Sequence, residues 1–318
     1  MAIIEEHNAA VAERVVPLQV KNVLFATDFS ATSEAALPYA AAISRHFGST
    51  LHLAHVLSDT AILMMTGGVD YVSMGTLYDD AHAEAKEKLD ALAARLEGVP
   101  QRNYVRHGAI WKNLAIIVEE NKIDLIVLGT HGRTGLGKLL LGSVAEDILR
   151  HAPCPVLTVG PNISGRDRLP LLTQNTRDLA PLDLDLRHIV LATDFAAHAP
   201  DLARTACSLA AEFHARLTLL HVIEDYSHLG RQPEEIIEAR ARLRALIPDG
   251  CTLQSEPETL LEFGPPREEI LKVAAEREAD LIVLGARPKE EVGTTHLPWS
   301  TTHHVVASAR CPVLTLRV

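Results

Sequence analysis

The chain has 318 residues, of which 47% are hydrophobic and 22% charged, a composition typical of a folded soluble protein with about two domains. Acidic residues outnumber basic residues by 41 to 30, and the formal net charge of -11 argues against nucleic acid as a partner. The start of the chain lacks a basic stretch followed by an apolar run, and no stretch approaches about 18 apolar residues, so we expect a cytoplasmic protein without a membrane partner. Four cysteines without a CxxC pair argue against a disulfide framework and a thiolate zinc site, so reduced structural thiols are expected.

The sequence repeats itself. Five short segments of the first half recur in the same order in the second half, which indicates a duplicated domain. The shift is 166 residues from Asn22 to His188 and 157 residues from Cys154 to Cys311, so the first copy is longer between its second and third strands. The matched pairs are 22–29 with 188–195, 51–56 with 217–222, 107–108 with 263–264, 124–129 with 280–285 and 154–158 with 311–315.

The predicted elements of the first copy alternate along the chain. After an N-terminal extension over residues 1–18, the first domain covers residues 19–160, and most of its matched segments are short β-branched apolar runs typical of strands buried on both faces. Helical patterns lie between these runs, at residues 33–47, 78–96, 111–121 and 144–151. The loop between the second and third strands holds three methionines that could fold over a ligand, although ordinary packing is the alternative. These are Met64, Met65 and Met74.

A linker over residues 161–185 precedes the second domain, residues 186–318, which repeats the same order of elements. Alternating strands and helices predict parallel βαβ units, hence an α/β, doubly wound sheet with helices on both faces. The last strands of the two copies, residues 155–159 and 312–316, would form apolar sheet edges. We expect each copy to cover the edge of the other.

A glycine pattern, G-x2-G-x9-G-S, follows the fourth strand of the first copy, with Gly129, Gly132 and Gly142 at its glycine positions. A triphosphate needs several N–H donors close to its oxygens, and glycine lets the backbone approach and adopt positive φ. Ser143 and Glu146 match a capping box, which predicts a helix N-terminus suited to a phosphate. The alternative is that the glycines only turn the chain and Ser143 only caps the helix.

Two other nucleotide motifs fit less well. Gly135 and Gly137 have no third glycine at the Rossmann spacing and do not lie on the first βα turn. The stretch from Gly132 to Lys138 resembles a P-loop, but Leu139 stands where a hydroxyl would hold Mg²⁺. Neither a Rossmann cofactor nor a P-loop nucleotide is therefore expected.

The glycine pattern, the Ala-Thr-Asp that ends the first strand and the Cys-Pro-Val that opens the last strand together resemble the universal stress protein family. The chain is similar to a tandem member, with the motif of the ATP-binding branch complete in the first copy. The resemblance implies two five-stranded parallel sheets of order 3-2-1-4-5, related by a pseudo-twofold axis. Family dimers associate through the last strand, so the second domain is expected as the partner of the first, and a homodimer of whole chains is possible.

The resemblance also implies ATP as ligand, with Mg²⁺ held mainly through the phosphates. Asp28 would lie near the adenosine, and the backbone of Val56 would pair with the adenine edge. The alternative for Asp28 is a carboxylate that caps the next helix. The carried-over ligand residues are Ala26, Thr27, Asp28, Val56, Gly129, Thr130, Gly132, Arg133, Gly142, Ser143 and Val144.

The second copy departs from the pattern. Gly285 matches Gly129, but Pro288 stands at the place of Gly132 and removes an N–H donor. Trp299 and Ser300 stand at the places of Gly142 and Ser143. We therefore expect one nucleotide per chain, with Arg287 or Lys289 as an alternative source of charge in the second copy.

The function predicted from the sequence is an ATP-binding stress-response protein in which nucleotide occupancy biases a conformation or a partner interaction. A slow ATPase or self-phosphorylating enzyme using Asp28 is the first alternative, and a nucleotide-free interaction or chaperone-like module is the second. The sequence shows neither a Ser-His-Asp set nor a pair of carboxylates near the glycines, so efficient catalysis is not predicted. His52 and His55 lie on opposite faces of one strand, and the adjacent His303 and His304 diverge, so no histidine metal site is predicted.

Overall fold

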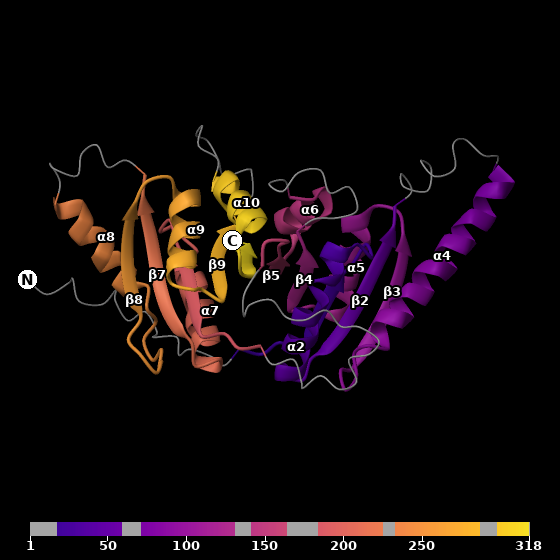
Figure 1. The fold of residues 1–318 in the computed structure, drawn as a ribbon, viewed down its shortest axis with the longest axis horizontal. Helices are drawn as coiled ribbons and strands as arrows, with labels where there is room; N and C mark the ends of the chain where they lie inside the picture. Colours follow the sequence, from indigo (N-terminus) through magenta and orange to yellow (C-terminus); the bar gives the residue numbers. More distant parts are fainter. Residues whose placement is uncertain are drawn as a thin grey trace, which may run out of the picture.

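The computed structural model describes residues 18–58, 71–130, 141–163, 184–224, 233–286 and 298–317 (Figure 1). Each copy contributes five strands. Those of the first copy are β1 (Asn22–Ala26), β2 (Thr50–Leu57), β3 (Gln101–His107), β4 (Leu125–Gly129) and β5 (Val156–Val159). Those of the second copy are β6 (His188–Ala192), β7 (Arg216–Ile223), β8 (Glu258–Phe263), β9 (Leu281–Ala286) and β10 (Val313–Arg317).

All ten strands form one continuous sheet, in the order β3-β2-β1-β4-β5-β10-β9-β6-β7-β8. Each half has the expected 3-2-1-4-5 order and is parallel throughout. The doubly wound α/β prediction is confirmed. The two halves are not separate sheets, because β5 pairs with β10 antiparallel and joins them.

The seam between the halves has local twofold symmetry. Leu157 lies opposite its own counterpart, Leu314. The hydroxyl of Thr158 donates to the carbonyl of Val313 at 3.1 Å, and the hydroxyl of Thr315 donates to the carbonyl of Val156 at 3.2 Å. Both apolar strand edges are thereby covered, and the sheet ends instead at β3 and β8.

The helices of the two copies extend the same symmetry. In the first copy they are α1 (Ala31–Glu34), α2 (Leu37–Phe47), α4 (Tyr71–Ala93), α5 (Ile110–Asn121) and α6 (Ser143–His151). In the second they are α7 (Ala199–Glu212), α8 (Pro233–Ala245), α9 (Pro266–Glu276) and α10 (Pro298–Ser308). Side chains of α2, α4, α7 and α8 enter one apolar core and those of α5, α6, α9 and α10 enter the other. Each core includes residues of both copies, and α4 and α8 lie at the outer ends of the molecule (Figure 1).

Two pairs of equivalent residues meet where α2 and α7 approach each other. His46 and Glu212, which are 166 positions apart, join through His46 Nε2 and Glu212 Oε1 at 2.7 Å. The rings of Phe47 and Phe213, the next pair, meet edge to face with centroids 6.2 Å apart. The two copies therefore touch through side chains as well as through the sheet.

The helix predicted over residues 33–47 is divided in two. α1 ends at Glu34 and α2 begins at Leu37, because Pro38 has no amide hydrogen and is accommodated in the first turn of a helix. α4 begins at Tyr71 instead of residue 78, so Met74 belongs to a helix and not to the predicted loop. Met64 and Met65 lie outside the described residues, and within the described ones no helix is long and apolar enough to cross a membrane.

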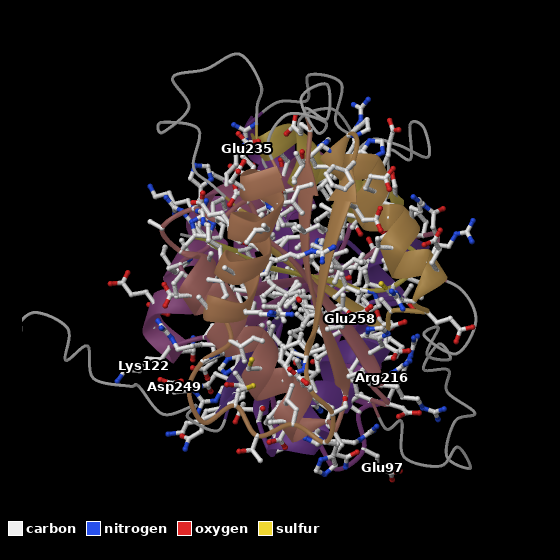
Figure 2. The ribbon with its side chains drawn as sticks, turned by 90° about the vertical axis from the view of Figure 1, so that its left-hand side faces the viewer. Glu97, Lys122, Arg216, Glu235, Asp249 and Glu258 are labelled. Carbon is white, nitrogen blue, oxygen red and sulfur yellow. The ribbon has the colours of Figure 1, made fainter. Side chains whose placement is uncertain are left out.

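The outer end of the second copy is strongly charged. Figure 2 views the molecule from that side and labels Glu258 on β8 and Arg216 at the start of β7. Glu258 Oε1 accepts a hydrogen bond from the guanidinium of Arg277 at 2.7 Å. Such charges discourage another chain from adding a strand to this edge.

Candidate functional site

The site predicted from the sequence lies where the winding of the sheet reverses. Ala26, at the end of β1, pairs with Ala54 of β2 on one side and with Leu128 of β4 on the other. The connections that leave β1 and β4 pass to opposite faces of the sheet. Ligands of open α/β sheets bind in the crevice that this reversal leaves at the carboxyl ends of the strands.

The turn that follows β1 is held by short hydrogen bonds. The Phe29 amide donates to Thr27 Oγ1 at 3.0 Å, and Phe29 adopts the left-handed conformation with φ of 61°. The Nδ1 of His55 donates to the carbonyl of Thr27 at 2.8 Å, and the His55 and Phe29 rings lie 4.4 Å apart. Thr27 is buried, so its side chain supports the floor of the crevice from below.

Asp28 does not cap the helix after β1. Its Oδ1 accepts a hydrogen bond from the amide of Ser30 at 3.0 Å, which closes a local turn. The cap of α1 is Ser30, whose hydroxyl accepts from the amide of Ser33 at 3.2 Å. The capping alternative for Asp28 is wrong, because the N-cap of α1 is Ser30, two residues after Asp28.

Val56 presents its backbone to the crevice. Along β2, the amide of Thr27 binds the carbonyl of Ala54 at 3.0 Å, so Ala54 faces β1 and Val56, two residues further, faces the same side. The ladder between β1 and β2 ends at Ala26 with Ala54. β3 continues beside Val56 on the other side, where Val56 pairs with Arg106, but on the β1 side the ladder has ended, so the amide and carbonyl of Val56 point past the end of β1.

The two ends of the glycine stretch meet at the end of β4. The Thr130 amide donates to the carbonyl of Val159 at 3.1 Å, and the Gly142 amide donates to the carbonyl of Thr130 at 2.8 Å. Gly129 has no room for a side chain, since a Cβ there would lie 2.6 Å from the backbone oxygen of Thr32. Gly132 and Arg133 fall between these ends and lie outside the described residues.

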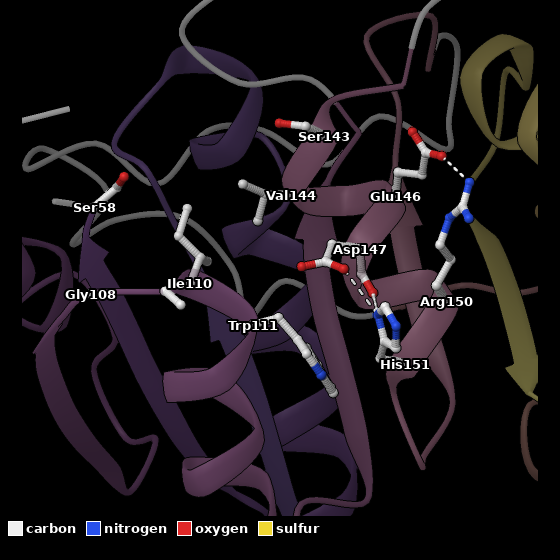
Figure 3. A pocket seen from close by; sticks show the side chains of 11 residues that line it. Ser58, Gly108, Ile110, Trp111, Ser143, Val144, Glu146, Asp147, Arg150 and His151 are labelled. Carbon is white, nitrogen blue, oxygen red and sulfur yellow. Dashed lines mark hydrogen bonds and ion pairs between the residues drawn. The ribbon is translucent and has the colours of Figure 1, made fainter. Parts of the chain in front are cut away.

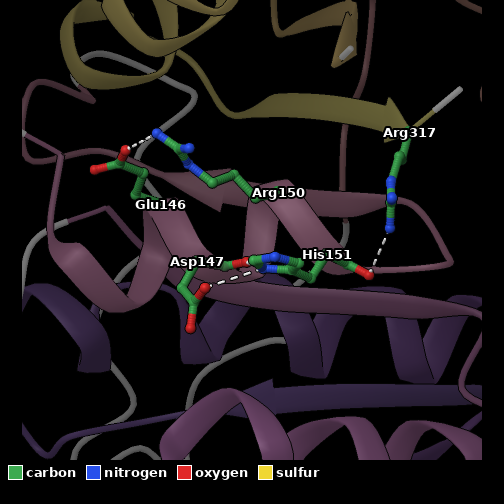
Figure 4. Close-up of polar contacts among 5 residues, drawn as sticks. All are labelled: Glu146, Asp147, Arg150, His151 and Arg317. Atoms are coloured by element: carbon green, nitrogen blue, oxygen red, sulfur yellow. Dashed lines mark hydrogen bonds and ion pairs between the residues drawn. The ribbon is translucent and has the colours of Figure 1, made fainter. Parts of the chain in front are cut away.

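The capping box predicted at Ser143 is wrong by one residue. Gly142 is the N-cap of α6, with φ of −65° and ψ of 144°, and no side chain caps this helix end. Ser143 is the first helical residue, and Glu146 instead pairs with Arg150 one turn later (Figure 4). Because no side chain caps this end, the first backbone N–H groups of α6 have no side-chain acceptor and can donate to a ligand in front of the helix.

A cleft of about 740 Å³ opens between α5 and α6 beside this helix start (Figure 3). Of the predicted ligand residues, Ser143 and Val144 line it, whereas the end of β1, Val56, Gly129 and Thr130 do not. The residues that line the cleft are Ser58, Gly108, Ala109, Ile110, Trp111, Ser143, Val144, Glu146, Asp147, Arg150 and His151.

Sequence reasoning missed the contribution of β3 and α5 to this cleft. Gly108 follows β3 with φ of 107°, and the matching Gly264 has φ of 141°, values that favour glycine. The pairing of 107–108 with 263–264 in the repeat was the signal that could have placed this turn at the site. Trp111 carried no such signal, because Arg267 replaces it in the second copy.

The far end of the cleft connects to the second copy. His151 Nδ1 lies 3.0 Å from Asp147 Oδ1, and the Trp111 ring stacks against the His151 ring with centroids 5.9 Å apart. Arg317 of β10 donates to the carbonyl of His151 at 3.0 Å (Figure 4). α6 therefore begins at the glycine motif and ends against the last strand of the other domain.

The corresponding region of the second copy is built differently. A Cβ on Gly285 would lie 2.6 Å from the His198 ring nitrogen instead of a backbone oxygen. The hydroxyl of Thr302 donates to the carbonyl of Gly285 at 3.0 Å. Trp299 and Ser300 lie inside α10, which already begins at Pro298, whereas Gly142 precedes its helix. Arg287, Pro288 and Lys289 lie outside the described residues.

The described histidines and carboxylates do not form a metal centre. Within the described part of the chain, no group of three or more His, Cys, Asp or Glu side chains could hold a metal ion. His52 lies against Tyr104 and Asn22, at 3.1 and 3.2 Å, while His55 reaches the opposite side of β2. Burial, together with the charge of Arg102, lowers the pKa of His52 to about 4, so this ring is neutral at physiological pH.

Comparison with known proteins gives a consistent result. The model of the family described as the universal stress protein family matches residues 19–160 and 185–317. Universal stress protein MJ0531 of Methanocaldococcus jannaschii is 31% identical over 139 residues, which make up 44% of this chain and 81% of that protein. A universal stress protein structure from Archaeoglobus fulgidus covers 94% of this chain and 99% of its own, with 22% identity and a TM-score of 0.66. Another from that organism, described as a complex with dAMP, covers 41% of this chain and 98% of its own, with 22% identity and a TM-score of 0.32.

Proposed function

Because this chain belongs to the universal stress protein family, some of whose members bind nucleotides, we propose that its first copy binds ATP and that nucleotide occupancy biases a conformation or a partner interaction in a stress response. The observation that carries the proposal is the junction of β4 with α6. There the Gly142 amide is tied to Thr130, and the uncapped start of α6 opens on the cleft. A helix start of this kind offers N–H donors and partial positive charge to a phosphate.

The nucleotide would lie across the crevice. The adenine would meet the backbone of Val56 beside Asp28, and the phosphates would reach the amides of Gly142, Ser143 and Val144. Ala26, Thr27, Gly129 and Thr130 would form the floor, and Gly132 and Arg133 would complete the phosphate loop. Mg²⁺ would be held mainly through the phosphates.

The contacts of α6 support a role for occupancy. Its first turn would hold the phosphates, while the carbonyl of His151, at its end, accepts from Arg317 of the second domain. A small movement of α6 on binding would therefore be felt at the seam between the copies. We propose that the second domain is the permanent partner of the first and that it binds no nucleotide.

Two further expectations complete the proposal. We place the protein in the cytoplasm, on the grounds that none of its four cysteines forms a disulfide. A homodimer of whole chains would have to form on surfaces other than β5 and β10, which are already paired with each other. Light scattering of the full chain distinguishes a monomer from such a dimer.

The test is the ligand itself. Heating the purified full chain and separating the released small molecules by chromatography should give adenine nucleotide at one equivalent or less per chain. If the protein is purified empty, ATP with Mg²⁺ should raise the melting temperature, since a ligand at about 100 times its dissociation constant adds roughly 2.7 kcal/mol of stability. If no nucleotide is released and ATP does not raise the melting temperature, the result favours the nucleotide-free interaction module. If the wild-type chain releases phosphate from ATP, and the Asp28→Ala variant binds ATP but releases none, the result favours the ATPase.

A further inference from the structure

The ten-stranded sheet ends in two strands that are paired on one side only. β3 is hydrogen-bonded to β2, and β8 to β7, and the structure describes no strand beyond either of them. The two strands lie toward opposite ends of the long axis of the molecule (Figure 1). An unpaired edge offers its outward N–H and C=O groups to a strand of another chain.

The two edge strands carry opposite charges at equivalent positions. Arg102 and Arg106 on β3 correspond in the repeat to Glu258 and Glu262 on β8. Both arginines are exposed, and both glutamates are partly exposed. The row of charges is therefore basic at one end of the sheet and acidic at the other.

All four charged residues lie on the same face of the sheet. Residues two apart on a strand share a face, so Tyr104 lies on the face of the two arginines, and Leu260 lies on the face of the two glutamates. Tyr104 and Leu260 both pack against the apolar core that α5 and α9 enter. If β3 and β8 met, the two charged rows would therefore lie side by side.

Contacts within the molecule leave these charges able to bind a partner. Glu258 Oε1 accepts a hydrogen bond from Arg277 at 2.7 Å, but a carboxylate can accept several such bonds. The guanidinium of Arg106 lies 5.9 Å from the centroid of the Tyr104 ring, in a contact that leaves its N–H groups available. Between them, the described residues give Arg106 no carboxylate partner.

The backbone of each edge strand presents alternate residues outward. In β3, the Gly108 amide donates to the Leu57 carbonyl at 2.9 Å, so the even-numbered residues face β2. In β8, the Gly264 amide donates to the Ile223 carbonyl at 3.1 Å, so the even-numbered residues face β7. The odd-numbered residues of both strands therefore direct their amides and carbonyls away from the sheet.

We propose that β3 of one molecule pairs antiparallel with β8 of another, so that the chain assembles head to tail through the two edges of its sheet. The halves of the sheet run in opposite directions, because β5 and β10 are antiparallel. Two molecules in the same orientation therefore bring β3 and β8 together as antiparallel strands.

One register satisfies both the charges and the backbone. When Arg102 lies opposite Glu262, Arg106 lies opposite Glu258, because each pair of like charges is spaced by four residues. The charged residues then occupy positions without hydrogen bonds between them, where Cα atoms are about 4.5 Å apart and side chains are closest. The outward-facing residues that exchange hydrogen bonds in this register are Asn103 with Leu261 and Val105 with Thr259.

The same charges select the partner. Pairing β3 with a second β3 places arginines opposite arginines, and pairing β8 with a second β8 places glutamates opposite glutamates, which is unfavourable. The acidic side chains that keep other strands away from β8 are the ones that β3 complements. The contact is therefore between unlike surfaces, and such contacts build open chains or rings instead of a closed pair.

The helices leave room for this pairing. α4 packs over β2 and β3, and α8 packs over β7 and β8, on the same face of the sheet. In the joined sheet these helices are separated by two strand spacings, which amount to about 10 Å, the usual distance between packed helices. The joint thus continues the layers that each molecule already has.

The assembly should be weak and sensitive to salt, because exposed ion pairs contribute little and are screened. None of the four charged residues lines the nucleotide cleft. The proposal does not depend on nucleotide binding, and either can fail without the other.

Sedimentation velocity of the full chain, over increasing protein concentration, tests the proposal. In dilute buffer the wild-type chain should form species that grow with concentration beyond a dimer, and about 1 M salt should reduce them. Arg102→Glu and Glu262→Arg should each weaken self-association at least ~10-fold. Each substitution imports the residue at the equivalent position of the other copy, so folding should be retained, which circular dichroism verifies.

Two double variants with the same net charge test the register. Arg102→Glu with Glu262→Arg exchanges the charges of one opposed pair and should restore self-association to within about threefold of wild type. Arg106→Glu with Glu262→Arg places like charges in both pairs and should not restore it. The proposal is overturned if the wild-type chain stays a single species up to millimolar concentration in dilute buffer, or if the two double variants associate equally.

Discussion

The turns that follow β1 and β6 are nearly the same in the two copies. Phe29 and Phe195 have φ of 61° and 60°. In each copy a histidine on the next strand, His55 or His221, contacts the threonine carbonyl at the turn at 2.8 Å. The Ala-Thr-Asp-Phe segment is therefore a device that ends the first strand, and it persists whether or not the glycine motif follows.

The regions after β4 and β9 differ. Gly142 precedes α6 and leaves its first amides uncapped, whereas α10 begins earlier, at Pro298, and contains Trp299. The His198 ring also lies against Gly285 in the second copy. Both copies keep the fold, but only the first keeps the glycine and the uncapped helix start that suit a phosphate. We therefore expect a nucleotide at the β4 and α6 junction and not at its counterpart in the second copy.

The largest expected effect comes from making the first copy resemble the second. Gly142→Trp should weaken ATP binding at least about 100-fold, because losing two charge-assisted hydrogen bonds costs roughly 3 to 6 kcal/mol. The backbone at Gly142 suits any residue, so folding should be retained. Titration calorimetry measures the affinity, with Ser300→Ala in the second copy as the matched control. Affinity within threefold of wild type would place the phosphates elsewhere.

The second prediction concerns two buried histidines, one in each copy, which lie on strands that are not equivalent. In the first copy His52 on β2 lies against Asn22, and in the second His188 on β6 lies against Thr218. The pKa of His52 is about 4 in the folded chain and 6.5 in the unfolded chain. Between these two pH values the unfolded chain binds a proton at His52 that the folded chain does not bind, so falling pH favours unfolding. The free energy of unfolding should therefore be fully present above pH 6.5 and should fall by at most about 3 kcal/mol as the pH falls to about 4.

Urea unfolding at several pH values measures this loss. His52→Gln should flatten the dependence between pH 6.5 and 4. His188→Asn, which imports the residue of the first copy, should flatten it in the same direction, because burial also lowers the pKa of His188. An unchanged slope in His52→Gln would mean that other groups govern the acid response.

The third prediction compares the two strand-end glycines. Gly129→Ala should cost about 1 to 3 kcal/mol, because its Cβ would meet a backbone oxygen that the start of α1 holds in place. Gly285→Ala should cost less than about 1 kcal/mol, because its Cβ would meet the end of a side chain, the His198 ring, and not backbone. Chemical denaturation of both variants checks the difference. Equal losses would show that the His198 ring is as rigid as the backbone.

The smallest expected effect concerns α1, the short helix after the turn that follows β1. In the described residues, the second copy has no equivalent of this helix after β6. Ser30→Ala removes the cap of α1 and should cost about 1 kcal/mol. The second copy has Ala196 at this place and no short helix there, so Ala196→Ser should gain nothing measurable. Thermal unfolding of the two variants tests the comparison, and a gain from Ala196→Ser would indicate a capped turn in the second copy.

The sequence predicted most of the fold because buried parallel strands leave continuous apolar runs, and the repeat located each run twice. It predicted that each copy would cover the last-strand edge of the other, but not that β5 and β10 pair into one continuous sheet, because the apolar run over residues 155–159 does not reveal how its partner covers it. The site was predicted in part. Glycines report backbone approach, but Ser143 was misread as a cap because S-x-x-E also fits a helix that begins one residue earlier. Gly108 went unassigned because its role depends on which strands become neighbours.

The seam of β5 with β10 has a consequence for biosynthesis. The first domain is complete by residue 160, yet Val156 finds its partner only when Thr315 has been made. At roughly 5 to 20 residues per second, translation leaves the apolar edge of β5 bare for about 10 to 30 s. During that interval a neighbouring nascent chain offers the same bare edge, so we expect misassembly of this protein to proceed by strand exchange between chains on one polysome.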